Sequence, residues 1–446
     1  SRAVLVQAEV SSTGFFFASQ PIGQMIHVTI SSLGGQSLEV DVKLDSTVAD
    51  VKKFTSRKWH LPCLAHCLMH GSQVLQDIEL ISAHCLEDTA SLSLSMITSF
   101  EQASKQLEHV LPKVRHQALL DLGSIPWKAG PTVIELVSAR LEDEVYDVQQ
   151  AAVATLGKIV EKGDKVAIAA VTARLKQEGL HVKHAAVLAL SQIAEKGDEQ
   201  VIAALLACVE DNTYWVSCLK IAAVEVLAQL SEKGNERAIA AITTCLDQEH
   251  SMEIAEALAD IAERGDERAI PAIITCLQDN DADMKQTAVT ILGHLVEKGD
   301  TRAIDAISAC LDDEDSFVTV AALQSFAQIV QKGDCEAIVR VISCLRKEQS
   351  FVRQAALEVL AQICVNFDDT TVNTVIAHLQ DQDSDVRHTA VKVLSQIVEK
   401  GNNAAFAATI ARLEDEDHSV RQAALDSLVS MLANSRDHQL CHQGSA

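Results

Sequence analysis

Aromatic residues are scarce in this chain of 446 residues. They make up 3% of it, whereas apolar residues as a whole reach 48% and charged residues 22%. This apolar content is ample for a large core, and the modest charged fraction argues against wholesale disorder. We therefore expect a folded protein whose core needs little aromatic volume.

Long hydrophobic runs and an excess of basic residues are also missing. Charged residues interrupt every long segment beyond residue 100, so we find no run of about 18 apolar residues that would form a membrane-spanning helix. The 37 basic and 62 acidic residues give a formal net charge of −25. Such a charge repels phosphate backbones and anionic lipid surfaces. We expect protein partners rather than nucleic acid or a membrane surface.

Motifs that mark enzymes are absent as well. The sequence has no glycine-rich phosphate loop, no serine nucleophile elbow and no zinc motif. Cys63 and Cys67 lie near other cysteines and histidines, but they lack paired Cys-x-x-Cys spacing. The sequence therefore predicts no catalytic residue, no metal and no cofactor.

The 12 cysteines are spread along the chain and do not form the framework of a small disulfide-rich domain. We expect free thiols in the cytoplasm or another reducing compartment. Because the chain begins at Ser1 rather than methionine, an organelle interior stays open. Residues 1–24 hold only a short apolar run, too brief for a signal-peptide core, and are expected to be an extension.

Residues 25–98 carry the alternating pattern of β-strands. The pair Gly34-Gly35 separates the first two apolar runs. Ser46-Thr47 offers an N-cap for a helix over 48–58, which must end before Leu61-Pro62. The expected order is strand, strand, helix, strand and closing strand. Apolar residues alternate in three runs, 26–30, 38–42 and 92–96.

This segment resembles the ubiquitin-like family through Leu38-Glu39-Val40, Asp45-Ser46-Thr47-Val48, Val51-Lys52, Leu61-Pro62 and the run from Leu68 to Leu75. The resemblance implies an α+β domain of the β-grasp type. It also implies that one face of the sheet docks partners. That face maps onto Leu33, Leu68, Ser93 and Ser95, and the two serines weaken it.

A conjugated modifier of that family ends in a free Gly-Gly, whereas this chain continues through residues 97–99 into helices. A fused recognition domain is therefore the better interpretation. A plain structural cap for the rest of the chain is a comparable alternative.

From residue 99 onward the sequence repeats with a period of 34 residues. One unit holds three extra residues, and the following unit is three residues short. Each repeated block predicts a helix that ends at a left-handed glycine and a next helix that begins at the following Asp or Asn. The glycines are Gly163, Gly197, Gly234, Gly265, Gly299, Gly333 and Gly401.

Each unit predicts two helices with buried apolar stripes, as at Val148, Ala152, Leu156 and Ile159 in one second helix. Neither stripe is covered by its own unit, so neighbouring units must stack. The sequence predicts an all-α solenoid of about ten helix pairs over 99–435, followed by a tail over 436–446.

The repeats carry Asp-x-x-Val-Arg or a close variant, as at 383–387 and 351–353. This is similar to HEAT repeats, specifically the short form that also occurs in phycobilisome-lyase-like proteins. Tetratricopeptide repeats share the period, but their Trp, Gly-Tyr and late proline markers are missing here. The resemblance implies an architecture and says little about chemistry.

The residue after the valine is basic in seven of nine repeats. In HEAT-like proteins this position commonly pairs with an acidic residue in the turn just before it, so the resemblance implies a structural ladder. The alternative is a basic track that binds a partner. The basic residues are Arg115, Lys183, Lys220, Lys285, Arg353, Arg387 and Arg421.

Five cysteines share another repeat position, near the end of the first helix. Stacked helices lie about 8–10 Å apart, which keeps such thiols too far apart for a disulfide or a shared zinc ion. We interpret them as small fillers of the core. They are Cys208, Cys245, Cys276, Cys310 and Cys344.

The inserted turn of the irregular unit contains adjacent aromatic residues, Tyr214 and Trp215. They fit a binding hot spot, or they fill a gap left by the shortened next unit.

The turns between paired helices are strongly acidic, as at 312–315 and 414–417. This acidity would steer a basic partner or simply keep the protein soluble.

We conclude from the sequence that the protein is a non-catalytic scaffold or adaptor, a subunit or assembly factor of a larger complex. Its predicted partner-binding residues are Leu33, Leu68, Tyr214, Trp215, Arg353, Arg387 and Arg421. One alternative is a bilin-lyase-like or other cofactor-handling solenoid, and another is a transport-receptor-like binder of basic partners. Deoxyhypusine hydroxylase activity is excluded because that HEAT-like enzyme holds iron with His-Glu dipeptides, which this chain lacks. The oligomeric state is not predictable.

Overall fold

The computed structural model describes residues 25–85, 91–125, 127–177, 179–210, 217–365, 369–397 and 403–443. It divides into two compact units, with the boundary between residues 174 and 175. The first unit holds a small sheet domain and the first helices of the repeat region. The second unit holds the remaining helices.

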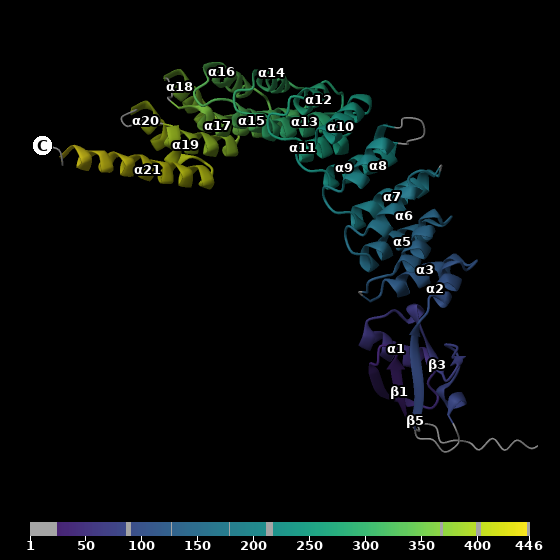
Figure 1. Cartoon of the computed structure of the whole chain (residues 1–446). Helices are drawn as coiled ribbons and strands as arrows, with labels where there is room; N and C mark the ends of the chain where they lie inside the picture. Colours follow the sequence, from purple (N-terminus) through teal and green to yellow (C-terminus); the bar gives the residue numbers. More distant parts are fainter. Residues whose placement is uncertain are drawn as a thin grey trace, which may run out of the picture. The chain divides into compact units, whose positions relative to one another are not determined.

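The sheet domain contains a five-stranded sheet of order β2-β1-β5-β3-β4 (Figure 1). Strands β1 and β2 form the expected antiparallel hairpin, and β1 pairs in parallel with the closing strand β5. The short strand β4 was not expected from the sequence. The strands are β1 Met25–Ser32, β2 Ser37–Lys43, β3 His66–His70, β4 Gln73–Val74 and β5 Ser91–Thr98.

Helix α1, Val48–Trp59, crosses this sheet and begins at the predicted cap. The Thr47 side chain accepts from the Asp50 amide, and Asp50 in turn accepts from the Thr47 amide, which satisfies two orphan N–H groups. Val48 and Val51 of the helix are fully buried against the apolar residues of the strands. The domain therefore has a core of its own.

Hydrogen bonds between Gln102 of α2, the first helix of the repeats, and the Lys52–Asp77 ion pair connect α2 to the sheet domain. Lys52 of α1 is 1% exposed and donates to Asp77 at 2.9 Å and to Gln102 of α2 at 3.0 Å. Gln102 also donates to Asp77 at 2.6 Å. Close by in the chain, the rings of Phe100 and Trp127 stack with centroids 6.4 Å apart. The domain is thus fixed to the repeats rather than joined by a free linker.

The rest of the described chain is helical, and first and second helices alternate as the period predicted. The first helices are α2 Glu101–Leu107, α4 Pro131–Ala139, α6 Lys165–Arg174, α8 Glu199–Glu210, α10 Glu236–Gln248, α12 Ala269–Cys276, α14 Thr301–Cys310, α16 Cys335–Cys344, α18 Asp369–Ala377 and α20 Asn403–Ala411. The second helices are α3 Pro112–Leu122, α5 Tyr146–Ile159, α7 Leu180–Ile193, α9 Ser217–Leu230, α11 Met252–Ile261, α13 Ala282–Leu295, α15 Ser316–Ile329, α17 Ser350–Ile363, α19 Ser384–Ile397 and α21 His418–Gln443. Short 3-10 turns lie at Cys63–Ala65, Ile81–His84, Arg140–Glu142, His378–Gln380 and Arg412–Glu414. Helix α21 continues past residue 435, where we expected a tail to begin.

The regular spacing of the glycines within this chain has a different local cause from the one that the sequence predicts. Helix α13 ends at Leu295, four residues before Gly299, whose φ is 90°. The glycine is therefore not the residue that ends the helix. Instead its amide donates to the Ile329 carbonyl at the end of the next second helix, at 2.8 Å. The following Asp300 caps the next helix, as predicted.

The second helices of the second unit form one row and the first helices another (Figure 1). Each second helix packs directly on the next, from α7 through α9, α11, α13, α15, α17 and α19 to α21. Small residues allow this close approach, since a Cβ added to Gly293 of α13 would meet the Ser325 side chain of α15 at 2.8–2.9 Å. No helix in the described ranges is long and apolar enough to cross a membrane.

Candidate functional site

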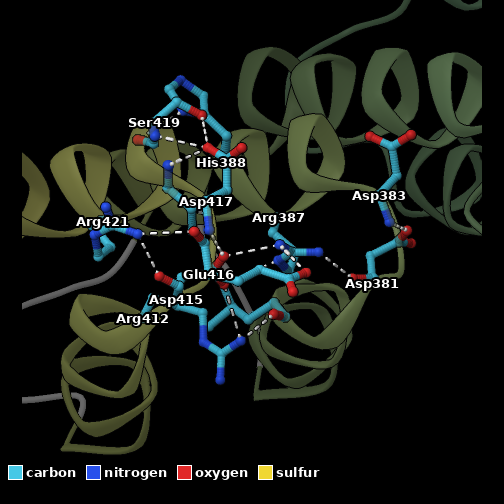
Figure 2. A network of polar contacts seen from close by, with 12 residues as sticks. Asp381, Asp383, Arg387, His388, Arg412, Asp415, Glu416, Asp417, Ser419 and Arg421 are labelled. Atoms are coloured by element: carbon cyan, nitrogen blue, oxygen red, sulfur yellow. Dashed lines mark hydrogen bonds and ion pairs between the residues drawn. The ribbon is translucent and has the colours of Figure 1, made fainter.

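The basic residue after the repeated valine binds two turns at once, as Arg387 illustrates (Figure 2). Its Nε and one terminal nitrogen donate to the two oxygens of Asp415 at 3.0 and 2.8 Å. Its other terminal nitrogen donates to the carbonyls of Asp381 and Gln382 at 3.0 and 3.1 Å. Arg387 therefore holds the turn before its own helix and the turn of the next repeat together.

The same contact recurs at a separation of 28 residues in both units. Arg115 and Arg353 also make bidentate contacts to an aspartate while donating to two carbonyls of the preceding turn. The predicted ladder thus exists, but its acidic partner lies in the turn that follows rather than in the turn just before. The pairs are Arg115–Asp143, Lys285–Asp313, Arg353–Asp381 and Arg387–Asp415.

The aspartate of each pair has a second structural role. Asp415 accepts from the Asp417 amide at 3.0 Å, and Asp417 accepts from the amide of Ser419 in the first turn of α21. Burial raises the pKa of Asp415, but the hydrogen bonds from Arg387 and Asp417 outweigh this, and the pKa lies below its ordinary value. Many aspartate side chains of these turns therefore accept hydrogen bonds within the fold.

The ladder residues are poor candidates for the partner-binding track that we considered. The side chains of Arg387 and Arg353 are 6% and 14% exposed, and both are saturated by internal acceptors. Among the side chains that the structure describes, Arg421 donates only to the Asp415 and Glu416 carbonyls, at 2.7 and 2.9 Å. Arg353 and Arg387 thus have the geometry of joints between repeats, whereas Arg421 holds only the turn before its own helix.

The structure corrects the predicted docking face of the sheet domain by one residue. Leu68 is 0% exposed and lies in the core, whereas Ser95 is exposed and pairs with Met69. Because side chains alternate along a strand, Met69 rather than Leu68 flanks Ser95 on the outer face. Leu33 is 85% exposed in the hairpin turn, as a docking residue must be.

Other predicted positions give mixed results. Tyr214 and Trp215 lie outside the described residues. Among the aligned cysteines, Cys276, Cys310 and Cys344 are buried, and burial raises the pKa of each to about 11. Such thiols are poor nucleophiles at neutral pH. In the part of the chain that the structure describes, no group of three or more His, Cys, Asp or Glu residues is arranged to hold a metal ion.

Shallow grooves lie between successive second helices. One groove of about 430 Å³ runs between α19 and α21 and is lined by His388, Lys392 and Gln422. A groove of about 380 Å³ between α11 and α13 uses Gln286 and Thr290, which occupy the same repeat positions as His388 and Lys392. In the first unit a groove of about 410 Å³ lies between α3 and α5. The repeats thus offer similar open grooves on their second helices, lined by both polar and apolar residues.

One exposed feature escaped the sequence analysis. Phe317 of α15 and Phe351 of α17 are 66% and 41% exposed, and their rings stack with centroids 5.6 Å apart. The signal was present, because the two residues are separated by one period of 34 and precede the same repeated valine. We had assigned roles only to the valine and to the basic residue after it.

Comparison with solved structures supports the helical fold. Importin β, crystallised in an ammonium sulfate condition, is 14% identical, with a TM-score of 0.50 over 74% of this chain and 51% of its own. This chain thus spans about half the length of importin β. Human deoxyhypusine hydroxylase in complex with glycerol is 19% identical over 74% of this chain and 95% of its own, with a TM-score of 0.26. Ubiquitin from Caldiarchaeum subterraneum is 23% identical over 17% of this chain and 94% of its own, with a TM-score of 0.16.

The last two TM-scores support no fold assignment, and the likeness to importin β concerns the fold alone. No curated protein matches the sequence. A family model for the adaptin N-terminal region, however, matches residues 83–413, which is well over half of the chain. With its alternating helices, stacked repeats and internal ladder, the chain belongs to the adaptin N-terminal region family of HEAT- or armadillo-like solenoids.

Proposed function

We propose that this protein is a non-catalytic scaffold or transport-type adaptor that binds other proteins through the second-helix face of its solenoid. The observation that carries the proposal is the recurrence of shallow, open grooves between successive second helices. Binding sites for small molecules are usually clefts or cavities that bury most of the ligand's surface. Open grooves that repeat along a stack suit an extended or helical protein segment instead.

The internal ladder supports the same proposal. Arg353 and Arg387 are saturated within the fold and join neighbouring repeats. A stack joined in this way presents its grooves at fixed spacing, which lowers the ordering cost of binding. Adaptins and importin β are non-enzymatic solenoid binders, which supports the proposal of a chain that presents surfaces to other proteins.

For the sheet domain we propose a ubiquitin-like β-grasp module that caps the repeats. The strand order with parallel β1 and β5 supports the β-grasp assignment. The contacts of Lys52 with Asp77 and Gln102 support the role of a cap. Its outer face, with Leu33 and Met69, remains available for docking.

The rival function is a cofactor-handling solenoid of the lyase type. It predicts a coloured small molecule bound to a lone chain, whereas a scaffold predicts a stoichiometric protein partner. Native mass spectrometry of the protein isolated gently from its source, with an absorbance spectrum of the same sample, separates the two. A partner without a chromophore supports the scaffold, and a lone chain with visible absorbance overturns it.

We propose a reducing compartment, the cytoplasm or an organelle interior, as the site of this function. The described cysteines are all free thiols. Several of them are buried, as Cys245 and Cys276 are, and pack as ordinary small residues. Fractionation with immunodetection tests this, since recovery from an oxidising compartment would contradict it.

A further inference from the structure

Phe317 and Phe351 form an aromatic pair on the surface of the second unit. Their rings are nearly parallel, with an interplanar angle of 23°. Each residue is the second of its helix, and helices α15 and α17 pack directly on one another. With 66% and 41% exposure, the two rings add little to the core. Their presence at this position therefore calls for a role at the surface.

Exposed carboxylates lie on both sides of the pair. Asp283 is the second residue of α13, and Asp385 is the second residue of α19. Because α13 packs on α15 and α19 on α17, the four residues form one row across four successive second helices. We call Asp283, Phe317, Phe351 and Asp385 the aromatic row. Both aspartates are exposed.

The turns next to the aromatic row add more negative than positive charge. Asp312 and Glu314 precede α15 and are exposed, as is Glu348 before α17. The opposing charges are the exposed Arg346 and the half-buried Lys347, whose ammonium lies 3.9 Å from Asp312. A cationic side chain placed over either phenyl ring would therefore have one aspartate of the row on its outer side and the acidic residues of the turns nearby.

We propose that the aromatic row docks an extended basic segment of a protein partner. The inference rests on the proposed scaffold function and names the partner's chemical class. Arginine and lysine bind aromatic faces within about 6 Å of the ring centre and form ion pairs with carboxylates. With helices about 8–10 Å apart, the row matches roughly eight residues of extended chain.

A second copy of this chain is a poor occupant of the row. Each copy carries a formal charge of −25, and its own exposed phenyl rings lie beside carboxylates. Apposing two such rows would place like charges together, which opposes association. A basic segment instead gains both the ring faces and the carboxylates.

The test uses the full chain and a fluorescein-labelled ten-residue peptide that alternates arginine with serine. Fluorescence anisotropy gives its affinity, and a peptide with citrulline in place of arginine controls for charge. Phe317→Leu with Phe351→Leu keeps apolar volume but removes the ring faces, and we expect affinity to fall about 5–10-fold. Asp283→Asn with Asp385→Asn is expected to weaken binding similarly, and Arg346→Glu to strengthen it.

A matched control is Asp147→Asn. Asp147 is the exposed second residue of α5, the same repeat position, but Lys113 and His181 take the place of the phenylalanines in the repeats before and after it. This change should leave the affinity within about twofold, an energy difference too small for a lost ion pair at the site. Circular dichroism of each variant confirms that the helices remain folded.

Three outcomes would overturn the proposal while leaving the scaffold function standing. The first is equal binding of the peptide to wild type and to the leucine variant, which indicates general attraction by net charge. The second is no binding of the arginine peptide at all. The third is self-association of the chain that the leucine variant abolishes, because the occupant is then a second copy. By contrast, a lone chain with a chromophore in the mass-spectrometry experiment would reject the scaffold function itself.

Discussion

At the scale of single residues, charge in this protein is mostly structural. Arg387 and Asp415 are nearly buried and make a bidentate contact, so each neutralises the other where water is scarce. Position in the repeat alone does not predict such a contact. Arg421 occupies the same position as Arg387, yet within the described side chains it donates only to two carbonyls.

That difference provides a matched pair of variants. Arg387→Ala leaves the buried carboxylate of Asp415 with Arg412, at 3.3 Å, as its remaining cationic partner among the described residues, and should lower the free energy of unfolding by about 3 kcal/mol. Arg421→Ala loses hydrogen bonds to carbonyls only and should cost about 1 kcal/mol. Urea unfolding followed by circular dichroism measures both. Equal losses would show that the contact between repeats adds nothing.

Acid should weaken this ladder. The hydrogen bonds from the arginines outweigh burial and hold the pKa values of Asp381 and Asp415 below their ordinary range. The unfolded state therefore takes up protons first as the pH falls. Their contribution is complete above about pH 4 and is lost below it. A melting temperature unchanged between pH 5 and pH 3 would contradict this assignment.

Because of His66, the stability of the sheet domain should depend on pH in a different range. Burial lowers its pKa to about 4 although the Pro62 carbonyl, 2.9 Å from Nδ1, favours the protonated ring. The unfolded value is about 6.5. The domain should therefore be fully stable above pH 6.5 and lose up to about 1.4 kcal/mol per pH unit as the pH falls towards 4.

Trp59 packs against the core of this domain and can report its unfolding. In a chain with Trp127→Phe and Trp215→Phe, the urea midpoint of Trp59 fluorescence should fall between pH 7 and pH 5. In the same background, His66→Gln should flatten that dependence. If the urea midpoint still depends on pH in the His66→Gln variant, titratable groups other than His66 cause the dependence.

At the scale of elements, the period of 34 residues predicted the alternating helices, the turns and their aspartate caps. The sequence did not predict which neighbouring turn a basic side chain reaches, because a repeat places equivalent acidic turns both before and after it. Nor did it predict that Leu68 faces the core, since shifting a strand by one residue moves every side chain to the other face. Contacts between repeats can be assigned only from the structure of the stacked repeats.

The approach of α13 to α15 gives a test at this scale. Gly293→Ala should gain helix propensity of about 1 kcal/mol, but its Cβ would lie 2.8–2.9 Å from Ser325 atoms. We expect a net loss of about 1–2 kcal/mol from overpacking. Ser325→Gly in the same chain should make Gly293→Ala stabilising, as measured by urea unfolding. If the effects of Gly293→Ala and Ser325→Gly on the free energy of unfolding are additive, the proposed clash between residues 293 and 325 is wrong.

At the scale of the whole molecule, the two kinds of charge have different roles. The buried Arg–Asp pairs join repeats, whereas exposed carboxylates such as Asp283 and Asp385 remain at the surface. The grooves between second helices are open and repeat along the stack, and no group of three or more His, Cys, Asp or Glu residues in the described ranges is arranged to hold a metal ion. This division of roles fits a solenoid that presents a surface to other proteins.

The sheet domain adds a further test of the account. Asp77→Ala would leave the Lys52 ammonium, 1% exposed, with only Gln102 as an acceptor. Unfolding of this domain should then become easier by about 2–3 kcal/mol, while Lys52→Met, which removes the charge itself, should cost less. Trp59 fluorescence in urea compares the two variants. If Lys52→Met lowers the free energy of unfolding more than Asp77→Ala does, an unpaired buried charge is not the reason for the loss in Asp77→Ala.

The central claim is that partners bind the second-helix face and that the ladder is internal. Hydrogen–deuterium exchange of the protein with and without the partner found by native mass spectrometry tests it most directly. The account predicts slower exchange in second helices that line the grooves, such as α13 and α19. Protection confined to the first helices or to residues 25–98 would contradict it.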